Sequence, residues 1–166
     1  LEKYGRVVYG QYGSPRFYPN AIDGHYVDIV PFYNFIVSPK PILTIDDLLK
    51  NFDFTANAIG INIKTGTIYD PVHGITDINN RVLRAVRLDF PERPVSSDIP
   101  LSAVSVFWFR LLHFQNKLGF EFEKQTKEWI IENAHRIKDI EIFKKYFFTP
   151  QISKELNLYI NKCLHR

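Results

Sequence analysis

Apolar residues in the first half of the chain fall into short runs that polar turns interrupt. The runs "RVVY" (residues 6–9) and "HYVDIVPF" (residues 25–32) are typical of strands, and "NAIDG" before the second run holds an Asp-Gly turn. Alternate side chains of a strand share a face, so Tyr26 and Asp28 lie on the same side. Asp28 is therefore a lone carboxylate on a strand that is otherwise apolar or aromatic.

The next segments alternate between turn residues and short apolar runs. "AIGINI" and "TGTIYD" (residues 58–70) predict a second hairpin, and "TIDDLLKNF" predicts a short helix with Thr44 as its N-cap. Residues 74–87 predict a polar turn followed by a short strand. Three prolines within residues 89–100 predict a loop.

From Leu101 onward the apolar positions take helical spacing. "SAVSVFWFRLLHFQNKL" is apolar over most of its surface, which predicts a largely buried helix that ends at Gly119. Three further amphipathic segments are expected to be helical, at residues 123–137, 139–148 and 153–164. A β-rich first half followed by a helical second half predicts an α+β fold.

Composition limits the classes of protein without choosing among them. The chain is 45% hydrophobic and 15% aromatic, as in a globular protein, and its formal charge of +3 permits nucleic-acid contact without arguing for it. No apolar run is long enough to cross a bilayer, so we expect no membrane contact. The single cysteine, Cys163, fits a reducing, cytoplasmic compartment. The chain contains no methionine, and we expect it to be a piece of a longer protein.

Two segments together resemble a known family. "DFTANAIGINIKTGTIYDPVHGITDINNRVLRAV" carries a DFTxNA segment, a strand pair, a DPxxGxxD turn and a strand, in that order. "FRLLHFQNKLGFEFEKQTKEWIIENA" is similar to a helix ending in Leu-Gly-Phe and the helix after it. This series resembles the head domain of class II tRNA nucleotidyltransferases (CCA-adding enzymes) and bacterial poly(A) polymerases.

The resemblance implies a fold and an activity. Residues 1–95 would form part of a nucleotidyltransferase-type palm sheet, and residues 96–166 a helical neck region of an RNA-binding kind. The implied reaction is template-independent: it transfers a nucleotide from an NTP, ATP and/or CTP, to an RNA 3′ end with Mg²⁺. A tRNA is one candidate acceptor. The sequence does not give the number of subunits.

The resemblance also assigns site residues. Asp28 would be the third carboxylate of the metal site and the catalytic residue, together with two carboxylates upstream of this chain. Mg²⁺ prefers such hard oxygen ligands on a rigid frame. Five residues are predicted to contact the nucleotide: Asp53, Thr55, Asn57, Arg84 and Arg110.

Structural roles for the same residues remain open alternatives. Asp53, Thr55 and Asn57 suit an N-cap or an Asx-type turn. Arg84 suits a solvated strand face. Asp70, Gly74 and Asp77 are expected to be architectural, because DPxxG favours a turn.

This sequence departs from the family pattern in two places. Asn51 and Phe52 stand where the family has an Arg pair, and "AVSVF" (residues 103–107) stands where the base-reading E-D-x-x-R motif is expected. Three hypotheses follow. One is an RNA nucleotidyltransferase, and another is a catalytically inactive relative that binds nucleotide, RNA or a protein partner. The third is an active enzyme with an altered choice of nucleotide or acceptor, because the base-reading helix has diverged. The fragment by itself is expected to be inactive.

Overall fold

The computed structural model describes residues 3–9, 15–21, 24–29 and 41–164. The contacts divide the chain into two compact units, residues 1–42 and residues 43–166, and each is described by itself. The predicted domain division at residue 95 stays a prediction.

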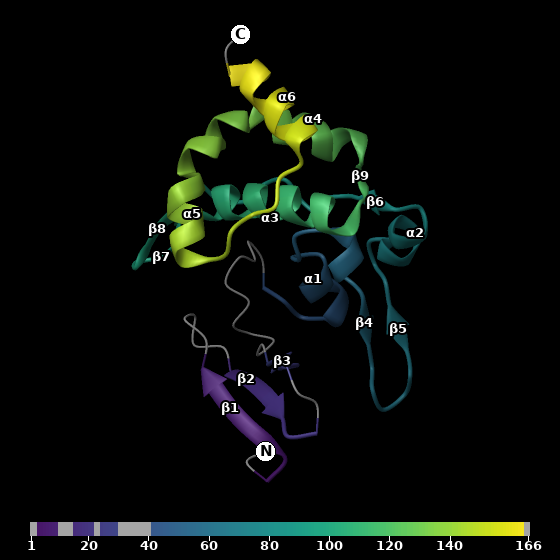
Figure 1. The fold of residues 1–166 in the computed structure, drawn as a ribbon. Helices are drawn as coiled ribbons and strands as arrows, with labels where there is room; N and C mark the ends of the chain where they lie inside the picture. The colour runs from purple at the N-terminus through teal and green to yellow at the C-terminus, as the bar shows by residue number, and fades with distance from the viewer. Residues whose placement is uncertain (1–2, 10–14, 22–23, 30–40, 165–166) are drawn as a thin grey trace. The chain divides into compact units, whose positions relative to one another are not determined.

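Unit 1 contains an antiparallel sheet of three strands in the order β1 (Gly5–Tyr9), β2 (Pro15–Pro19) and β3 (Val27–Asp28) (Figure 1). The hairpin predicted between residues 6–9 and residues 25–32 is wrong, because β2 lies between these strands and pairs with both of them. Gly5 sits where β1 approaches β2 closely, because a Cβ there would lie 2.1 Å from the carbonyl oxygen of Tyr18. Residues 30–32 of the strand expected at residues 25–32 lie outside the described residues.

Unit 2 mixes short strands with helices, as the α+β expectation requires. In chain order its elements are α1 (Ile45–Leu49), the 3-10 helix η2 (Thr55–Asn57), β4 (Gly60–Ile61), β5 (Ile68–Tyr69), α2 (Gly74–Asn79), β6 (Val82–Leu83), β7 (Pro94–Ser96), β8 (Ile99–Ser102), α3 (Ala103–Leu118), β9 (Glu121–Phe122), α4 (Lys124–Glu132), the 3-10 helix η3 (Ala134–Asp139), α5 (Ile140–Tyr146) and α6 (Lys154–Leu164).

Helix α3 runs through the middle of unit 2, with α4, α5 and α6 on one side and α1 and α2 toward the other (Figure 1). Its ends agree with the prediction. The Ser102 hydroxyl accepts a hydrogen bond from the backbone N–H of Ser105, and Gly119 takes the left-handed conformation (φ 64°) that ends the helix. Thr44 likewise caps α1 through a capping box with Asp47.

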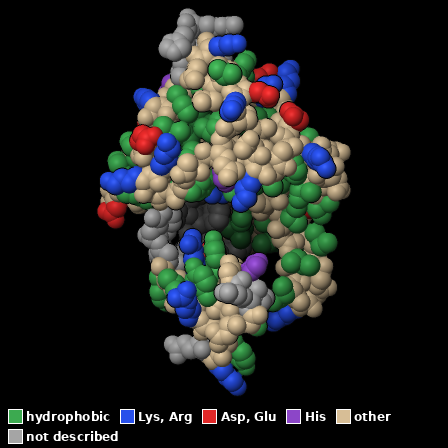
Figure 2. Space-filling model, in the orientation of Figure 1, with side chains coloured by type: hydrophobic (Ala, Val, Ile, Leu, Met, Phe, Trp, Pro, Cys, Tyr) green, Lys and Arg blue, Asp and Glu red, His purple; other side chains and the backbone are tan. Residues whose placement is uncertain are grey.

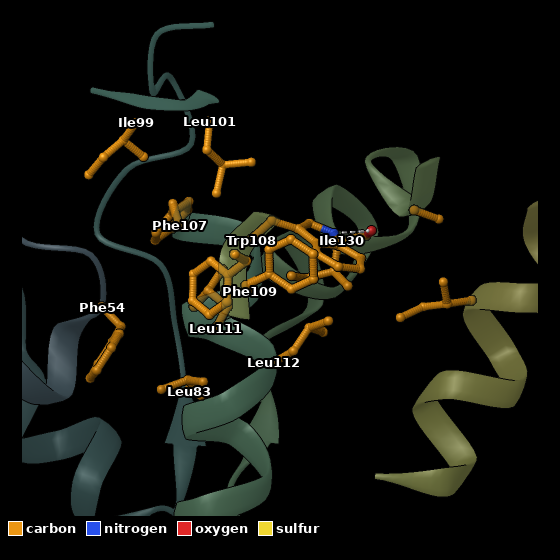
Figure 3. Close-up of a cluster of buried hydrophobic side chains, with 13 residues drawn as sticks. Phe54, Leu83, Ile99, Leu101, Phe107, Trp108, Phe109, Leu111, Leu112 and Ile130 are labelled. Carbon is orange, nitrogen blue, oxygen red and sulfur yellow. Dashed lines mark hydrogen bonds between the residues drawn. The ribbon is translucent and has the colours of Figure 1, made fainter. Parts of the chain in front are cut away.

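The hydrophobic core joins both halves of the chain around α3. Phe54 and Leu83, from the β-rich half, are buried in one cluster with side chains of α3, α4 and α5 (Figure 3). Trp108 lies in this cluster, and its indole Nε1–H donates a 2.9 Å hydrogen bond to the Ile130 carbonyl oxygen. The segments before and after residue 95 therefore share one core.

The turn predicted at residues 74–79 is wrong, because these residues form helix α2. The Asp70 carboxylate accepts hydrogen bonds from the backbone N–H groups of Gly74 and Ile75, which satisfies the first turn of the helix. A Cβ on Gly74 would lie 2.1 Å from the carbonyl oxygen of Thr55, so only glycine lets α2 approach η2. The DPxxG motif thus starts a helix and brings it close to the DFT segment.

The loop predicted at residues 89–100 is also corrected, since this segment contains most of an antiparallel hairpin, β7–β8. Pro94 pairs with Ser102 next to a register irregularity, and Pro100 lies in β8 between the paired residues Ile99 and Ser102. Strand β6 comes before α3 in the chain and β9 comes after it, and the two strands pair in parallel. The local sequence pattern does not reveal this long-range pairing.

Five isoleucines lie exposed on one part of unit 2. Figure 2 shows hydrophobic side chains gathered over β4, β5 and α2, where the exposed residues are Ile61, Ile63, Ile68, Ile75 and Ile78. Ile61 and Ile68 are directly opposite each other across the hairpin. Within the described ranges, no helix has the length and apolar character needed to cross a membrane.

Replacing Trp108 by Phe should destabilise unit 2, because the Ile130 carbonyl would be left buried without its donor and a small cavity would remain. We expect the free energy of unfolding to fall by about 1–3 kcal/mol from the lost bond alone. Chemical denaturation of Trp108→Phe measures it. The half-buried Trp129 provides the control, and an equal loss in Trp129→Phe would contradict the assignment.

His113 makes the stability of unit 2 depend on pH. Burial, and then the nearby Lys117 and Arg110, lower the pKa of His113 below its ordinary value of 6.5. Its Nδ1 accepts a 3.1 Å hydrogen bond from the Gln151 backbone N–H, which requires the neutral ring. The folded state therefore favours neutral His113. This stabilisation is present above the unfolded-state pKa and is lost as pH falls through the lowered pKa.

We expect His113→Gln, which keeps an acceptor but does not titrate, to lose less stability than the wild type on acidification. Urea denaturation at about pH 7.5 and about pH 5.5 tests this. His135→Gln, at an exposed histidine, is the control variant. An identical fall in stability for His113→Gln and the wild type would contradict the role of His113.

Candidate functional site

The predicted nucleotide-contacting residues fall into two hydrogen-bonded groups within unit 2. The first is centred on Asp53, whose side chain is only 14% exposed. Arg110 Nε donates to Asp53 Oδ2 at 2.5 Å, and Asn57 Nδ2 donates to Asp53 Oδ1 at 2.7 Å. Both oxygens of the Asp53 carboxylate therefore accept a hydrogen bond. The Asp53–Arg110 ion pair joins the DFT segment to helix α3.

The backbone fixes where Asp53 lies. Phe54 forms an antiparallel bridge with Ala85, and the Asp53 carbonyl oxygen accepts from the Val86 N–H at 3.1 Å. Burial of Phe54 in the core anchors the segment from the other side. The carboxylate is thus held by a strand-like contact on one side and by Arg110 on the other.

Acceptor and cationic groups meet at this first group. Asn57 Oδ1 is buried and has no hydrogen-bond partner within the part of the chain that the structure describes. Arg110, one-third exposed, lies over the Phe114 ring at 5.3 Å, and the Lys117 ammonium lies 5.8 Å from the same ring. An unsatisfied acceptor next to a guanidinium suits a ligand that carries both donor groups and negative charge.

The second group is built on the buried carboxylate of Asp77. Thr55 Oγ1 donates to Asp77 Oδ2 at 2.7 Å, and Arg84 donates to both Asp77 oxygens, at 2.9 and 3.3 Å. This hydrogen bonding raises the pKa of the Arg84 guanidinium above its ordinary value. Thr55 is 1% exposed, so its hydroxyl is committed to Asp77 and supports the fold.

Asp28 belongs to unit 1 and lies directly opposite Arg16 in the sheet. Arg16 Nε donates to Asp28 Oδ1 at 2.7 Å, with both side chains a little over 40% exposed. Within residues 3–9, 15–21, 24–29 and 41–42, Asp28 is the only carboxylate. No group of three His, Cys, Asp or Glu side chains that could hold a metal occurs among all described residues. These residues therefore do not by themselves fit a magnesium site.

Sequence reasoning named most of these residues but missed their pairing. It assigned Asp53 and Arg110 separately, although they form one ion pair, and it did not foresee Arg16 as the partner of Asp28. A signal for the first pair existed: Arg110 is the only charged residue in the buried part of an apolar helix, so it needs a carboxylate partner. The nucleotide-binding and catalytic roles stay predictions.

Comparison with known proteins shows what parts of this chain are similar to. Residues 23–84 match the poly(A) polymerase head domain. A stretch of 97 residues is 37% identical to a CCA-adding enzyme of Actinobacillus succinogenes and covers 58% of this chain and 22% of that protein. A stretch of 64 residues is 42% identical to a multifunctional CCA protein of Stenotrophomonas maltophilia, covering 39% and 16%. The match thus spans about a fifth of the length of these relatives.

Solved structures show the same fold. The crystal structure of the Bacillus stearothermophilus CCA-adding enzyme in complex with CTP matches 96% of this chain and 45% of that chain, with a TM-score of 0.56 and 18% identity. A CCA-adding enzyme in complex with ATP matches 98% and 33%, with a TM-score of 0.53 and 18% identity. The sequence match over residues 23–84 is thus to the poly(A) polymerase head domain, and the fold of the chain is similar to that of CCA-adding enzymes.

Proposed function

We propose that this chain is part of a template-independent RNA nucleotidyltransferase, which transfers a nucleotide from ATP and/or CTP to an RNA 3′ end. The family match over residues 23–84 carries the proposal. The Asp53–Arg110 pair supports it, because it joins the matched segment to the helix that follows the sheet. The acceptor RNA, with tRNA as the candidate that the relatives' names suggest, belongs to the same proposal.

In this proposal the first group borders the nucleotide. Arg110 and Asn57 hold the Asp53 carboxylate in one orientation. Asn57 Oδ1, which has no partner among the described residues, adds a second acceptor. Ribose hydroxyls and the exocyclic amino groups of adenine and cytosine are donors of the matching kind. Arg110 and Lys117 supply positive charge for the phosphates. Thr55 and Arg84 would act indirectly: both donate hydrogen bonds to Asp77, and these bonds hold the DFT segment in place.

Magnesium enters the proposal through residues beyond those described. Asp28 would be one ligand, yet Arg16 now occupies one of its oxygens, and no second carboxylate lies in the described part of unit 1. A site for Mg²⁺ would need further carboxylates from the whole protein and release of Arg16. Bound there, the ion would supply charge stabilisation at the transferred phosphate.

One observation favours the alternative, an inactive relative that still binds nucleotide. Ala103, Val104 and Phe107 occupy the positions of the expected base-reading motif, and all three are buried in unit 2. Apolar buried side chains offer no hydrogen bond to a base edge. Base choice would then need other residues, or the protein would bind a nucleotide without transferring it.

Nucleotide affinity tests the first group directly. In the whole protein, Asp53→Asn should weaken ATP and CTP binding about tenfold or more, because it removes a charged acceptor and releases Arg110. Isothermal titration calorimetry measures the affinity. Glu141→Gln, at an exposed helix position, removes the same charge elsewhere and should change nothing. Equal affinities for Asp53→Asn and the wild type would exclude Asp53 from the nucleotide site.

An assay of nucleotide transfer distinguishes the active nucleotidyltransferase from the inactive relative that only binds nucleotide. The whole protein, supplied with Mg²⁺ and labelled ATP or CTP, should extend an RNA 3′ end. Asp28→Asn should lower the rate at least about a hundredfold while nucleotide affinity is kept, since loss of one charge-stabilising group in an active site has that size. Gel analysis of labelled RNA measures the rate of extension for the wild type and for Asp28→Asn, and isothermal titration calorimetry measures their nucleotide affinity. Nucleotide binding without any extension by the wild type would establish the inactive relative instead.

A further inference from the structure

One face of the sheet in unit 1 carries a row of planar side chains. Arg6 lies directly opposite Tyr18 across β1 and β2, and Arg16 lies opposite Asp28 across β2 and β3. Tyr26 precedes Asp28 by two residues and contacts Tyr18 and Arg16, so it lies on the same side. Arg6, Arg16, Tyr18 and Tyr26 together are called the Arg–Tyr face below.

These four side chains touch in sequence across the sheet. The Arg6 guanidinium lies 4.9 Å from the Tyr18 ring centre, and the Tyr18 and Tyr26 ring centres are 5.5 Å apart. The Arg16 guanidinium lies 4.9 Å from the Tyr26 ring centre. The result is a continuous strip of guanidinium, ring, ring and guanidinium on neighbouring strands.

The strip is open to solvent and positively charged. Arg6 is exposed, Tyr26 is 48% exposed, and Tyr18 is half-buried. In the described part of unit 1, the cations Lys3, Arg6 and Arg16 stand against the single carboxylate Asp28. On the side shown in Figure 2, basic side chains lie among hydrophobic ones over β1 and β2. The surface therefore combines flat apolar rings with charge complementary to phosphate.

We propose that the Arg–Tyr face binds single-stranded nucleic acid. Unpaired bases would stack on Tyr18 and Tyr26, because every base offers a π-face to an aromatic ring. Arg6 and Arg16 would contact the backbone phosphates, and their planar groups can also stack on bases. A duplex hides its base faces inside the stack, so it would not use the rings. Asp28, the proposed metal ligand, lies opposite Arg16 on this face, so the proposal rests on the proposed function and adds the surface that would hold the single strand.

The test uses the whole protein and fluorescently labelled ten-nucleotide probes, oligo(rA) and oligo(dA), in anisotropy titrations. Replacing both tyrosines, Tyr18→Leu with Tyr26→Leu, should weaken binding about 10-fold to 100-fold. The double Phe variant keeps the rings and should bind like the wild type. Tyr159→Leu, at an exposed tyrosine of α6, is the matched control and should also bind like the wild type. Tighter binding of the oligo(rA) probe would show a preference for RNA. Equal binding of the two probes would show that the face binds single-stranded RNA and DNA alike.

Arg6→Gln provides a second, independent variant at an exposed residue, in case the double leucine variant fails to fold. Loss of one phosphate contact should reduce the slope of log affinity against log salt by about 1. Lys124→Gln, at an exposed lysine of α4, should leave the slope unchanged.

Unchanged binding in the folded leucine variant, an unchanged slope in Arg6→Gln, or equal binding of duplex and single strand would overturn the proposal. Nucleotide affinity, measured on the same variants, should stay at the wild-type value. Failure of this face is therefore distinguishable from failure of the Asp53 site.

Discussion

The burial of α3 is the constraint on which the rest of unit 2 depends. This helix is apolar on most of its surface, so strands, the 3-10 helices and the later helices must cover it on several sides. Arg110 is the exception on its buried part, and a charge in that place is tolerated only with a partner. Asp53 provides it, and the DFT segment is thereby fixed against the helix. The candidate site is thus a consequence of core packing.

Elements with local signals were predictable from the sequence, and elements with distant partners were not. The ends of α3 and the cap of α1 follow from Ser102, Gly119 and Thr44, which act on their own neighbours. Helix α2 was missed because its position depends on the contact between Gly74 and the Thr55 carbonyl, nineteen residues apart in the chain. The parallel pairing of β6 with β9 depends likewise on everything between them.

The same distinction applies to the candidate site. Resemblance identified Asp53, Asn57 and Arg110, yet only the folded chain shows that they meet and that Thr55 and Arg84 instead share Asp77. Cross-strand neighbours in unit 1 were equally hidden, because the register that sets Arg16 opposite Asp28 is not written in either strand alone. Residue identity was readable from the sequence, while pairing required the fold.

The Asp53–Arg110 pair also has a consequence for synthesis. Its two residues are 57 positions apart, so Asp53 leaves the ribosome well before its partner exists. At about 5–20 residues per second, the delay is roughly 3–11 s. During that time Phe54 has no α3 side chains to pack against. Phe54 is therefore without its core partners on the nascent chain until α3 emerges.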